Sequence, residues 1–178
     1  IGIKNIANLR IKFDCDILIQ NINQNIIKKL TKHTLMEHGN IYWPVISGNT
    51  SFPVNVSVKY KIPLIIWGAH QGIEQTGMFS HEHEVEMTRR YREDHDLYGK
   101  DEDSLISLDN DFHNDDLDQL RYPEMNQISS IGVRGIYLGN FLRWDSVVQH
   151  KLMIKLYKFK SNFLSRTFDT YDHVDCFN

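Results

Sequence analysis

Two side chains suited to acid–base and electrostatic chemistry, His70 and Glu74, follow an apolar run in this sequence. The run covers residues 62–67 and stops at Gly68. A continuous apolar run of this length is typical of a strand buried on both faces of a parallel sheet. Ligands of open α/β sheets bind beyond the carboxyl ends of such strands. The pattern predicts a ligand site just after Gly68, and a core strand followed by an ordinary polar loop is the alternative.

A second candidate for binding is the stretch 45–51, which we expect to be a loop before a helix over 52–60. Ser51 followed by Pro53 is typical of an N-cap and first turn. The apolar alternation in 52–60 also fits a strand, but a parallel strand at 62–67 needs a crossover before it. Free N–H groups at a helix N-terminus bind anions. The candidate sugar- or phosphate-binding residues are Ser47, Gly48, Thr50, Ser51 and Arg134.

Several arginines and histidines offer weaker signals. Arg134 can hold a phosphate or carboxylate through bidentate contacts, and so can the Arg89-Arg90 pair, although such pairs on exposed helices are usually only solvated. The triplet 81–83 reads His-Glu-His, close to His70 and Glu74 in the chain. Zinc needs three or four ligands in defined geometry, so surface histidines are the stronger interpretation and we predict no metal site.

The order of elements predicts how these residues are positioned. Helices are expected over 3–13, 25–37, 52–60, 82–95 and 145–157, and strands over 16–20, 62–67 and 135–138. Asn23 and Asp145 are expected to cap the helices that follow them. Strand–helix–strand order implies a parallel sheet, so the three strands should lie parallel with helices on both faces. We therefore predict a single α/β domain over 1–178.

Composition narrows the function classes. The chain has 178 residues, a net charge of -3 and two cysteines. This argues against a general nucleic-acid-binding surface and against a disulfide framework, and favours a cytoplasmic protein without a membrane span. Between residues 82 and 118 there are 14 acidic and four basic residues. We interpret 80–125 as a charged, partly helical insertion that is solvated or faces a partner, while 143–166 is basic.

Longer motifs carry a resemblance to a known family. They are 42–54 (Tyr-Trp-Pro-Val-Ile-Ser-Gly-Asn-Thr-Ser-Phe-Pro-Val), 62–77, 79–81 with 86–92, 131–138 and 166–171. Over nearly the whole chain, the sequence resembles the N-acetyl sugar amidotransferases. These belong to the PP-loop ATP pyrophosphatases. The resemblance implies a Rossmann-like sheet of the HUP (adenine nucleotide alpha-hydrolase-like) type with flanking helices.

The resemblance also implies an activity. Members convert a sugar N-acetyl group to an acetamidino group in surface polysaccharide, lipopolysaccharide or flagellin-glycan biosynthesis. ATP adenylates the acetamido oxygen with release of pyrophosphate, and ammonia from a glutaminase partner then displaces AMP. By position, Gly68 and His70 would bind the nucleotide, and His70 and Glu74 would be catalytic. ATP and Mg²⁺ are the implied cofactors, and a homo-oligomer is an open expectation.

One departure from the family bears on activity. The phosphate-binding motif Ser-Gly-Gly-x-Asp-Ser does not occur in these 178 residues. We interpret the chain as a fragment of a longer protein whose sheet is incomplete on its N-terminal side, and we expect residues 1–178 alone to be inactive. Two alternatives remain: a non-catalytic HUP-like binding or scaffold subunit, and a metal-dependent hydrolase using the histidines near 70–83.

Overall fold

The computed structural model describes residues 2–68, 88–108, 112–143 and 145–161. It is a mixed α/β structure in which helices dominate and two strands form a small parallel sheet. Contacts divide the chain into a terminal unit, made of Ile1–Ile19 and Arg143–Asn178, and a central unit, Gln20–Leu142. Within the described part, no helix is both long and apolar enough to cross a membrane.

The terminal unit contains helices α1 (Gly2–Phe13) and α9 (Ser146–Tyr157), as expected from their apolar periodicity. The Asp145 side chain accepts a hydrogen bond from the Val148 backbone N–H, which confirms the predicted N-cap. The predicted strand at 16–20 is wrong, because residues 15–23 form neither helix nor strand. An isolated extended segment without a paired neighbour has no ladder of backbone hydrogen bonds to make it a strand.

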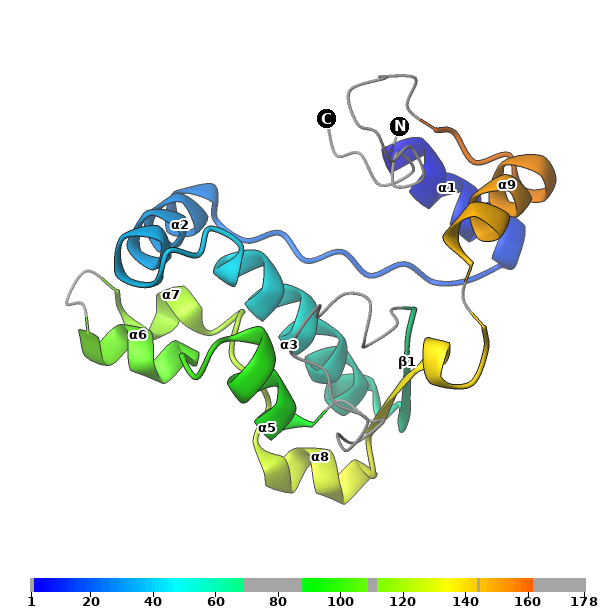
Figure 1. The fold of residues 1–178 in the computed structure, drawn as a ribbon. Helices are drawn as coiled ribbons and strands as arrows, with labels where there is room; N and C mark the ends of the chain where they lie inside the picture. Colours follow the sequence, from blue (N-terminus) through cyan, green and yellow to red (C-terminus); the bar gives the residue numbers. More distant parts are fainter. Residues whose placement is uncertain (1, 69–87, 109–111, 144, 162–178) are drawn as a thin grey trace. The chain divides into compact units, whose positions relative to one another are not determined.

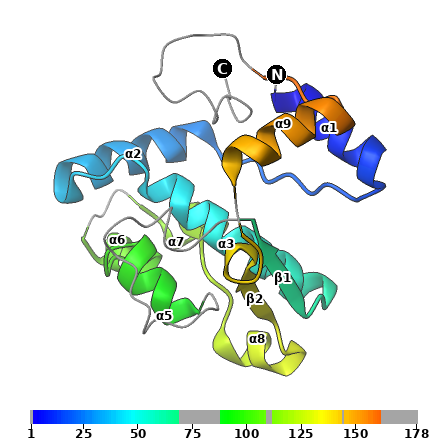
Figure 2. The same ribbon diagram turned by 45° about the vertical axis from the view of Figure 1, so that its right-hand side comes forward.

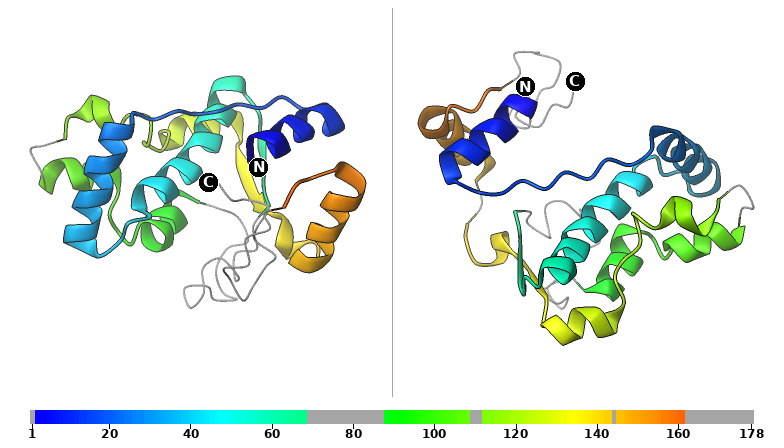
Figure 3. Two further views of the ribbon diagram at one scale, coloured as in Figure 1. Left: turned by 90° about the horizontal axis from the view of Figure 1, so that it is seen from above. Right: turned by 180° about the vertical axis from the view of Figure 1, so that it is seen from behind.

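The central unit holds the remaining elements (Figure 1). They are α2 (Gln24–His38), α3 (Trp43–Tyr60), β1 (Leu64–Trp67), α5 (Arg89–Tyr91), the π-helix η1 (Arg92–Asp96), α6 (Glu102–Leu108), α7 (Asn114–Leu117), α8 (Met125–Ile131), β2 (Arg134–Tyr137) and the 3₁₀ helix η2 (Leu138–Asn140). Asn23 caps α2 through a hydrogen bond from the Asn25 N–H, as predicted. Helix α3 contacts α2, α8, β1 and η1, so it is the element around which this unit is packed (Figure 3).

The hydrophobic core of the central unit lies where α2 and α3 meet the segment from η1 to α7. Its buried members are Leu30, Trp43, Leu97, Leu105, Phe112, Leu117 and Leu120. Five of these seven lie within 80–125, which we interpreted from the sequence as solvated or facing a partner, and for these five side chains that interpretation is wrong. The leucines there are too far apart to form a long stripe, yet each supplies one fully buried side chain.

The two strands pair in parallel, as predicted (Figure 2). Leu64 lies opposite Arg134 in the register, and Trp67 lies opposite Tyr137. The expectation that 62–67 is buried on both faces is wrong in the described structure, because Leu64 and Ile66 are about half exposed. With two strands in the sheet, side chains on one face reach α3 and α8 while those on the other remain uncovered by described residues.

Candidate functional site

The site predicted after β1 is described only in part. Gly68 directly follows the last strand residue, Trp67, and is exposed, with open space where a side chain would begin. A ligand can therefore approach its backbone. His70 and Glu74 lie outside the described residues, and so do His81 and His83. The described residues contain no group of three or more potential metal ligands.

The predicted anion-binding loop at 45–51 is wrong, because these residues form the first half of α3. The helix begins at Trp43 with Pro44 in its first turn, where proline is well tolerated. Pro53, which looked like a helix start, is inside the helix. A proline there removes one backbone hydrogen bond. The buried face of the helix, which packs on the core, offsets that loss.

The buried face of α3 is lined by small and polar residues. Ser47 and Ser51 have no exposed surface, and Thr50 is partly buried. Gly48 allows a close approach: a β-carbon there would meet the Leu120 side chain at 3.4 Å. As the structure has them, Ser47, Gly48 and Ser51 are packed against protein groups and present no surface to a ligand.

The partner of this polar face is a buried ion pair between Arg92 of η1 and Glu102 of α6. Arg92 is fully buried, and Glu102 is 4% exposed. The guanidinium Nε donates to Thr50 Oγ1 at 2.8 Å, and Nη2 donates to Ser47 Oγ at 3.0 Å. The Ser47 hydroxyl in turn donates to the Glu102 carboxylate. Because removing charges from water is costly, a buried ion pair needs further hydrogen bonds to its remaining polar atoms, and Ser47 and Thr50 provide them here.

This cluster was not predicted, and its signal in the sequence is weak. Arg92 and Glu102 stand ten positions apart in a stretch rich in charges of both signs. Three of the seven buried positions of α3, Trp43, Ser47 and Ser51, do recur at a spacing of four, which is helical. Counting serines as inward-facing residues would have indicated the long helix.

A pocket of about 130 Å³ opens beside the sheet in the central unit. Its walls come from α3, from residues of β1 and β2, from the start of α5 and from α8. The lining residues are Val54, Ile65, Trp67, Thr88, Arg89, Tyr122, Met125, Ile128, Val133, Arg134 and Gly135. Of the binding residues predicted from the sequence, the pocket includes Arg134.

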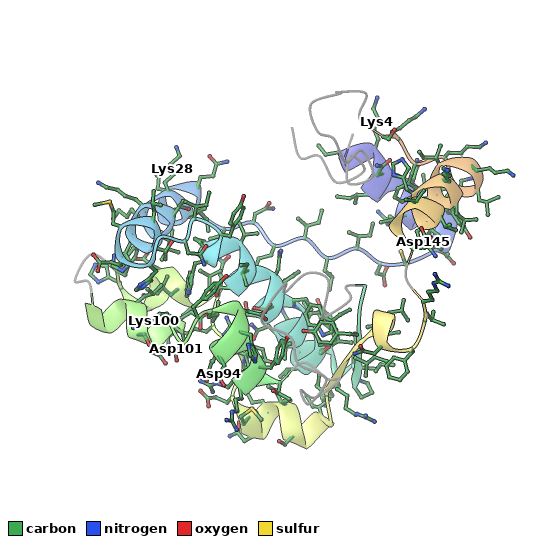
Figure 4. The ribbon with its side chains drawn as sticks, in the orientation of Figure 1. Lys4, Lys28, Asp94, Lys100, Asp101 and Asp145 are labelled. Atoms are coloured by element: carbon green, nitrogen blue, oxygen red, sulfur yellow. The ribbon has the colours of Figure 1, made fainter. Side chains whose placement is uncertain are left out.

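Arg89 is a charged lining residue of this pocket. Arg89 Nε donates to the Glu93 carboxylate at 2.7 Å. That hydrogen bond raises the pKa of Arg89, so its guanidinium stays charged. The neighbouring Arg90 is 92% exposed and pairs loosely with Asp94, marked in Figure 4. Of the two arginines considered from the sequence, Arg89 therefore lines the pocket and Arg90 is solvated.

Aromatic side chains complete the pocket. The Arg92 guanidinium lies 5.2 Å from the ring centroid of Tyr122, a cation–π contact that fixes the ring. Burial raises the pKa of Tyr122, so its phenol remains neutral at neutral pH. The buried Nε1 of Trp67 forms no hydrogen bond with any described residue. The buried ion pair therefore supports the wall of the pocket that Tyr122 forms. Trp67, another lining residue, has an indole N–H without a described hydrogen-bond partner.

No family model matches the chain, and no curated protein matches it.

Proposed function

We propose that this chain belongs to an ATP-dependent amidotransferase that converts a sugar N-acetyl group to an acetamidino group with glutamine-derived ammonia. The observation that supports this proposal is the parallel pairing of β1 with β2. It is the arrangement that a Rossmann-like sheet of the HUP type requires of these two motifs. The motif resemblance supplies the reaction and the glutaminase partner, and the presence of only two cysteines favours a cytoplasmic setting.

Parallel pairing has a direct consequence for the proposed site. The carboxyl ends of β1 and β2 lie at the same edge of the sheet, at Trp67 and Tyr137. Gly68 and the stretch containing His70 and Glu74 begin at that edge, where open α/β sheets bind their ligands. We assign Gly68 and His70 to nucleotide binding, and His70 and Glu74 to charge stabilisation during adenylyl transfer.

We assign fewer residues to substrate binding than the sequence suggested. Arg134 remains in it, because it lines the pocket beside the sheet. Ser47, Gly48 and Ser51 do not, since α3 buries them. ATP would supply the leaving group that activates the acetamido oxygen. The described residues provide no cluster of metal ligands, so we derive no step through Mg²⁺.

The test uses the protein as its gene encodes it, together with its glutaminase and an N-acetylated sugar. His70→Ala and Glu74→Ala should each lower the rate of AMP and pyrophosphate release by roughly 10²–10³-fold, because each removes a group aimed at developing charge. Gln75→Ala is the matched control in the same stretch and should keep most of the rate. Thermal melting should show that all three variants remain folded.

Two outcomes would contradict the proposal in different ways. Folded His70 and Glu74 variants with wild-type rates would remove this stretch from the active site. A wild-type protein that binds the sugar but releases no AMP with any ammonia source would favour the non-catalytic binding subunit. That second candidate is favoured by one observation, the lack of a Ser-Gly-Gly-x-Asp-Ser motif in these 178 residues.

A further inference from the structure

The corner where α2 meets α3 exposes a patch of large apolar side chains. The patch falls within residues 35–45, and each of its members is about half exposed or more. They are Leu35, Met36, Ile41, Tyr42 and Val45. Met36 and Tyr42 are the most open, at 75% and 65%. Single exposed apolar residues are normal on a protein surface, whereas a group of them at one corner marks an interaction site.

The backbone of this corner is fixed by hydrogen bonds. Gly39 ends α2 in the left-handed conformation, and its N–H donates to the Leu35 carbonyl at 3.0 Å. The Asn40 side chain accepts a hydrogen bond from the Tyr42 N–H at 2.8 Å. The turn between the two helices is therefore formed before any partner arrives. A preformed surface loses little conformational entropy on binding.

Two surfaces of opposite charge accompany the apolar patch. Helix α2 exposes Lys28, Lys29 and Lys32. Lys28, Lys32 and Met36 follow one another at a spacing of four, so the lysines share the exposed face of α2 with the patch. The stretch 101–120, which contains α6 and α7, has no lysine or arginine. Its exposed acidic residues in the described part are Asp103, Asp115 and Asp118.

The basic and acidic surfaces are neighbours within the central unit. Leu30 of α2 belongs to the same buried cluster as Leu105 of α6 and Leu117 of α7, and the three helices lie together at one end of the unit (Figure 1). At the corner itself, Trp43 Nε1 donates to the Lys100 carbonyl at 2.8 Å. Neighbouring patches of opposite charge complement a second copy of themselves turned by 180°. Such a copy satisfies both surfaces, whereas an acidic protein would satisfy the lysines alone.

We propose that this chain forms a symmetric dimer through the α2–α3 corner. The apolar patches of the two copies pack against each other at the two-fold axis. The lysines of each α2 face the aspartates of α6 and α7 in the other copy. The apolar side chains supply most of the affinity, and the charges fix the orientation. The dimer goes beyond the proposed amidotransferase activity, because the corner contains no residue assigned to catalysis or substrate binding.

Sedimentation equilibrium of the full-length protein measures the dimer and its dissociation constant. The wild type should have twice the mass of one chain. Met36→Lys and Tyr42→Asp should each raise the dissociation constant at least about 30-fold, because each places a charge at the centre of the interface. Met125→Lys is the matched control: Met125 of α8 is also half exposed, and its replacement should leave the dissociation constant unchanged. All three positions are exposed, so the melting temperatures should stay close to that of the wild type.

Mixing two variants tests the charged contacts. One variant carries Lys28→Glu and Lys32→Glu, and the other carries Asp115→Lys and Asp118→Lys. Each variant alone brings like charges together and should dimerise more weakly than the wild type. An equimolar mixture should form a heterodimer, because acidic side chains then meet basic ones at both contacts. Added salt should weaken the wild-type dimer and the heterodimer, since exposed charges are screened.

Three results would overturn the proposal. The first is a protein that remains monomeric at about 0.1 mM, and loss of glutaminase binding in Met36→Lys would then identify that protein as the occupant of the corner. The second is a dimer whose dissociation constant is unchanged in both Met36→Lys and Tyr42→Asp, which would place the interface elsewhere. The third is the lack of a heterodimer in the mixture of folded charge variants. None of these results changes the expected rates of the His70 and Glu74 variants, so the dimer and the proposed activity are tested separately.

Discussion

The two units of this chain are held together in different ways. The central unit has a contiguous core of seven buried apolar residues and a buried ion pair beside it. Among the described residues of the terminal unit, Phe159 is the one large apolar side chain that is buried, at 8% exposure. Ile3 and Ile11 of α1 are 86% and 75% exposed.

In the described part of the terminal unit, specific polar and ring contacts join the segments. Asn5 is buried and exchanges two hydrogen bonds with the backbone of Lys160, at 2.9 and 2.8 Å. Phe13 and Tyr157 stack with their ring centroids 4.6 Å apart. Hydrophobic burial is the dominant favourable term in folding, so we expect α1 and α9, whose described surroundings bury little apolar surface, to open at lower cost than the central unit. We therefore expect the free energy of local opening to differ between the two units of this chain.

The largest expected effect comes from the buried ion pair. Arg92→Met should lower the free energy of unfolding by about 3–5 kcal/mol, because it leaves the Glu102 carboxylate buried without its counter-charge. Urea denaturation measures the loss. Arg90→Met is the control: this arginine is exposed, and its removal should change stability by less than about 0.5 kcal/mol.

The double variant Arg92→Met/Glu102→Leu tests whether the unpaired Glu102 carboxylate causes the loss of stability. Replacing both charges with apolar groups removes the uncompensated carboxylate, and such replacements are often neutral. Most of the stability lost in Arg92→Met should therefore return. A single variant that loses less than about 1 kcal/mol would show that the pair contributes little to the central unit.

The second largest loss of stability should come from Asn5 and should be confined to the terminal unit. Asn5→Ala removes both hydrogen bonds to Lys160 and leaves its backbone N–H and C=O unsatisfied, at a cost of roughly 1–3 kcal/mol. Amide hydrogen exchange should become faster in α1 and α9 and stay unchanged in α2 and α3. Asn8→Ala, which loses one exposed contact to the Lys158 carbonyl, is the milder control. Equal acceleration in both units would mean that they unfold together.

Elements were predicted correctly from the sequence where neighbouring residues, such as an apolar stripe or an N-cap, decide the local structure. The apolar stripes of α1, α2 and α9 extend over three or more turns, and Asn23 and Asp145 cap helices as expected. The parallel strands were also predicted, because an apolar run after a helix implies a crossover. These features depend on neighbours in the chain, which a sequence displays directly.

The failures have a common physical cause, which is packing between distant segments. Residues 45–51 contain serine, glycine and asparagine, so local preference favoured a loop, yet tertiary burial against Leu120 and Glu102 makes them helical. Arg92 looks like any charged residue of an exposed helix until Ser47, Thr50 and Glu102 are placed around it. Of the predicted site, Arg134 lines a pocket, while His70 and Glu74 remain predictions.

The smallest effect concerns the start of α6, where Asp101 caps the helix (Figure 4). Its carboxylate accepts hydrogen bonds from the Ser104 hydroxyl at 2.6 Å and from the Ser104 N–H at 2.9 Å. Burial alone raises the pKa of Asp101, but these hydrogen bonds and the nearby arginines outweigh it, so the net pKa is lowered. A lowered carboxyl pKa stabilises the folded state above the unfolded value of about 3.9.

Ser104→Ala tests this cap through its dependence on pH. At pH 7 the variant should be less stable than the wild type by about 0.5–1 kcal/mol, because the charged acceptor loses one donor. The difference should shrink as the pH falls below about 4, since Asp101 takes up a proton and a neutral carboxyl is the weaker acceptor. Urea denaturation of both proteins from pH 7 to pH 2 measures it. Ser130→Ala, which removes a hydroxyl bonded to the Gln127 carbonyl, should show a difference independent of pH. A Ser104→Ala difference that is equally flat would show that the charge of Asp101 does not contribute to the cap.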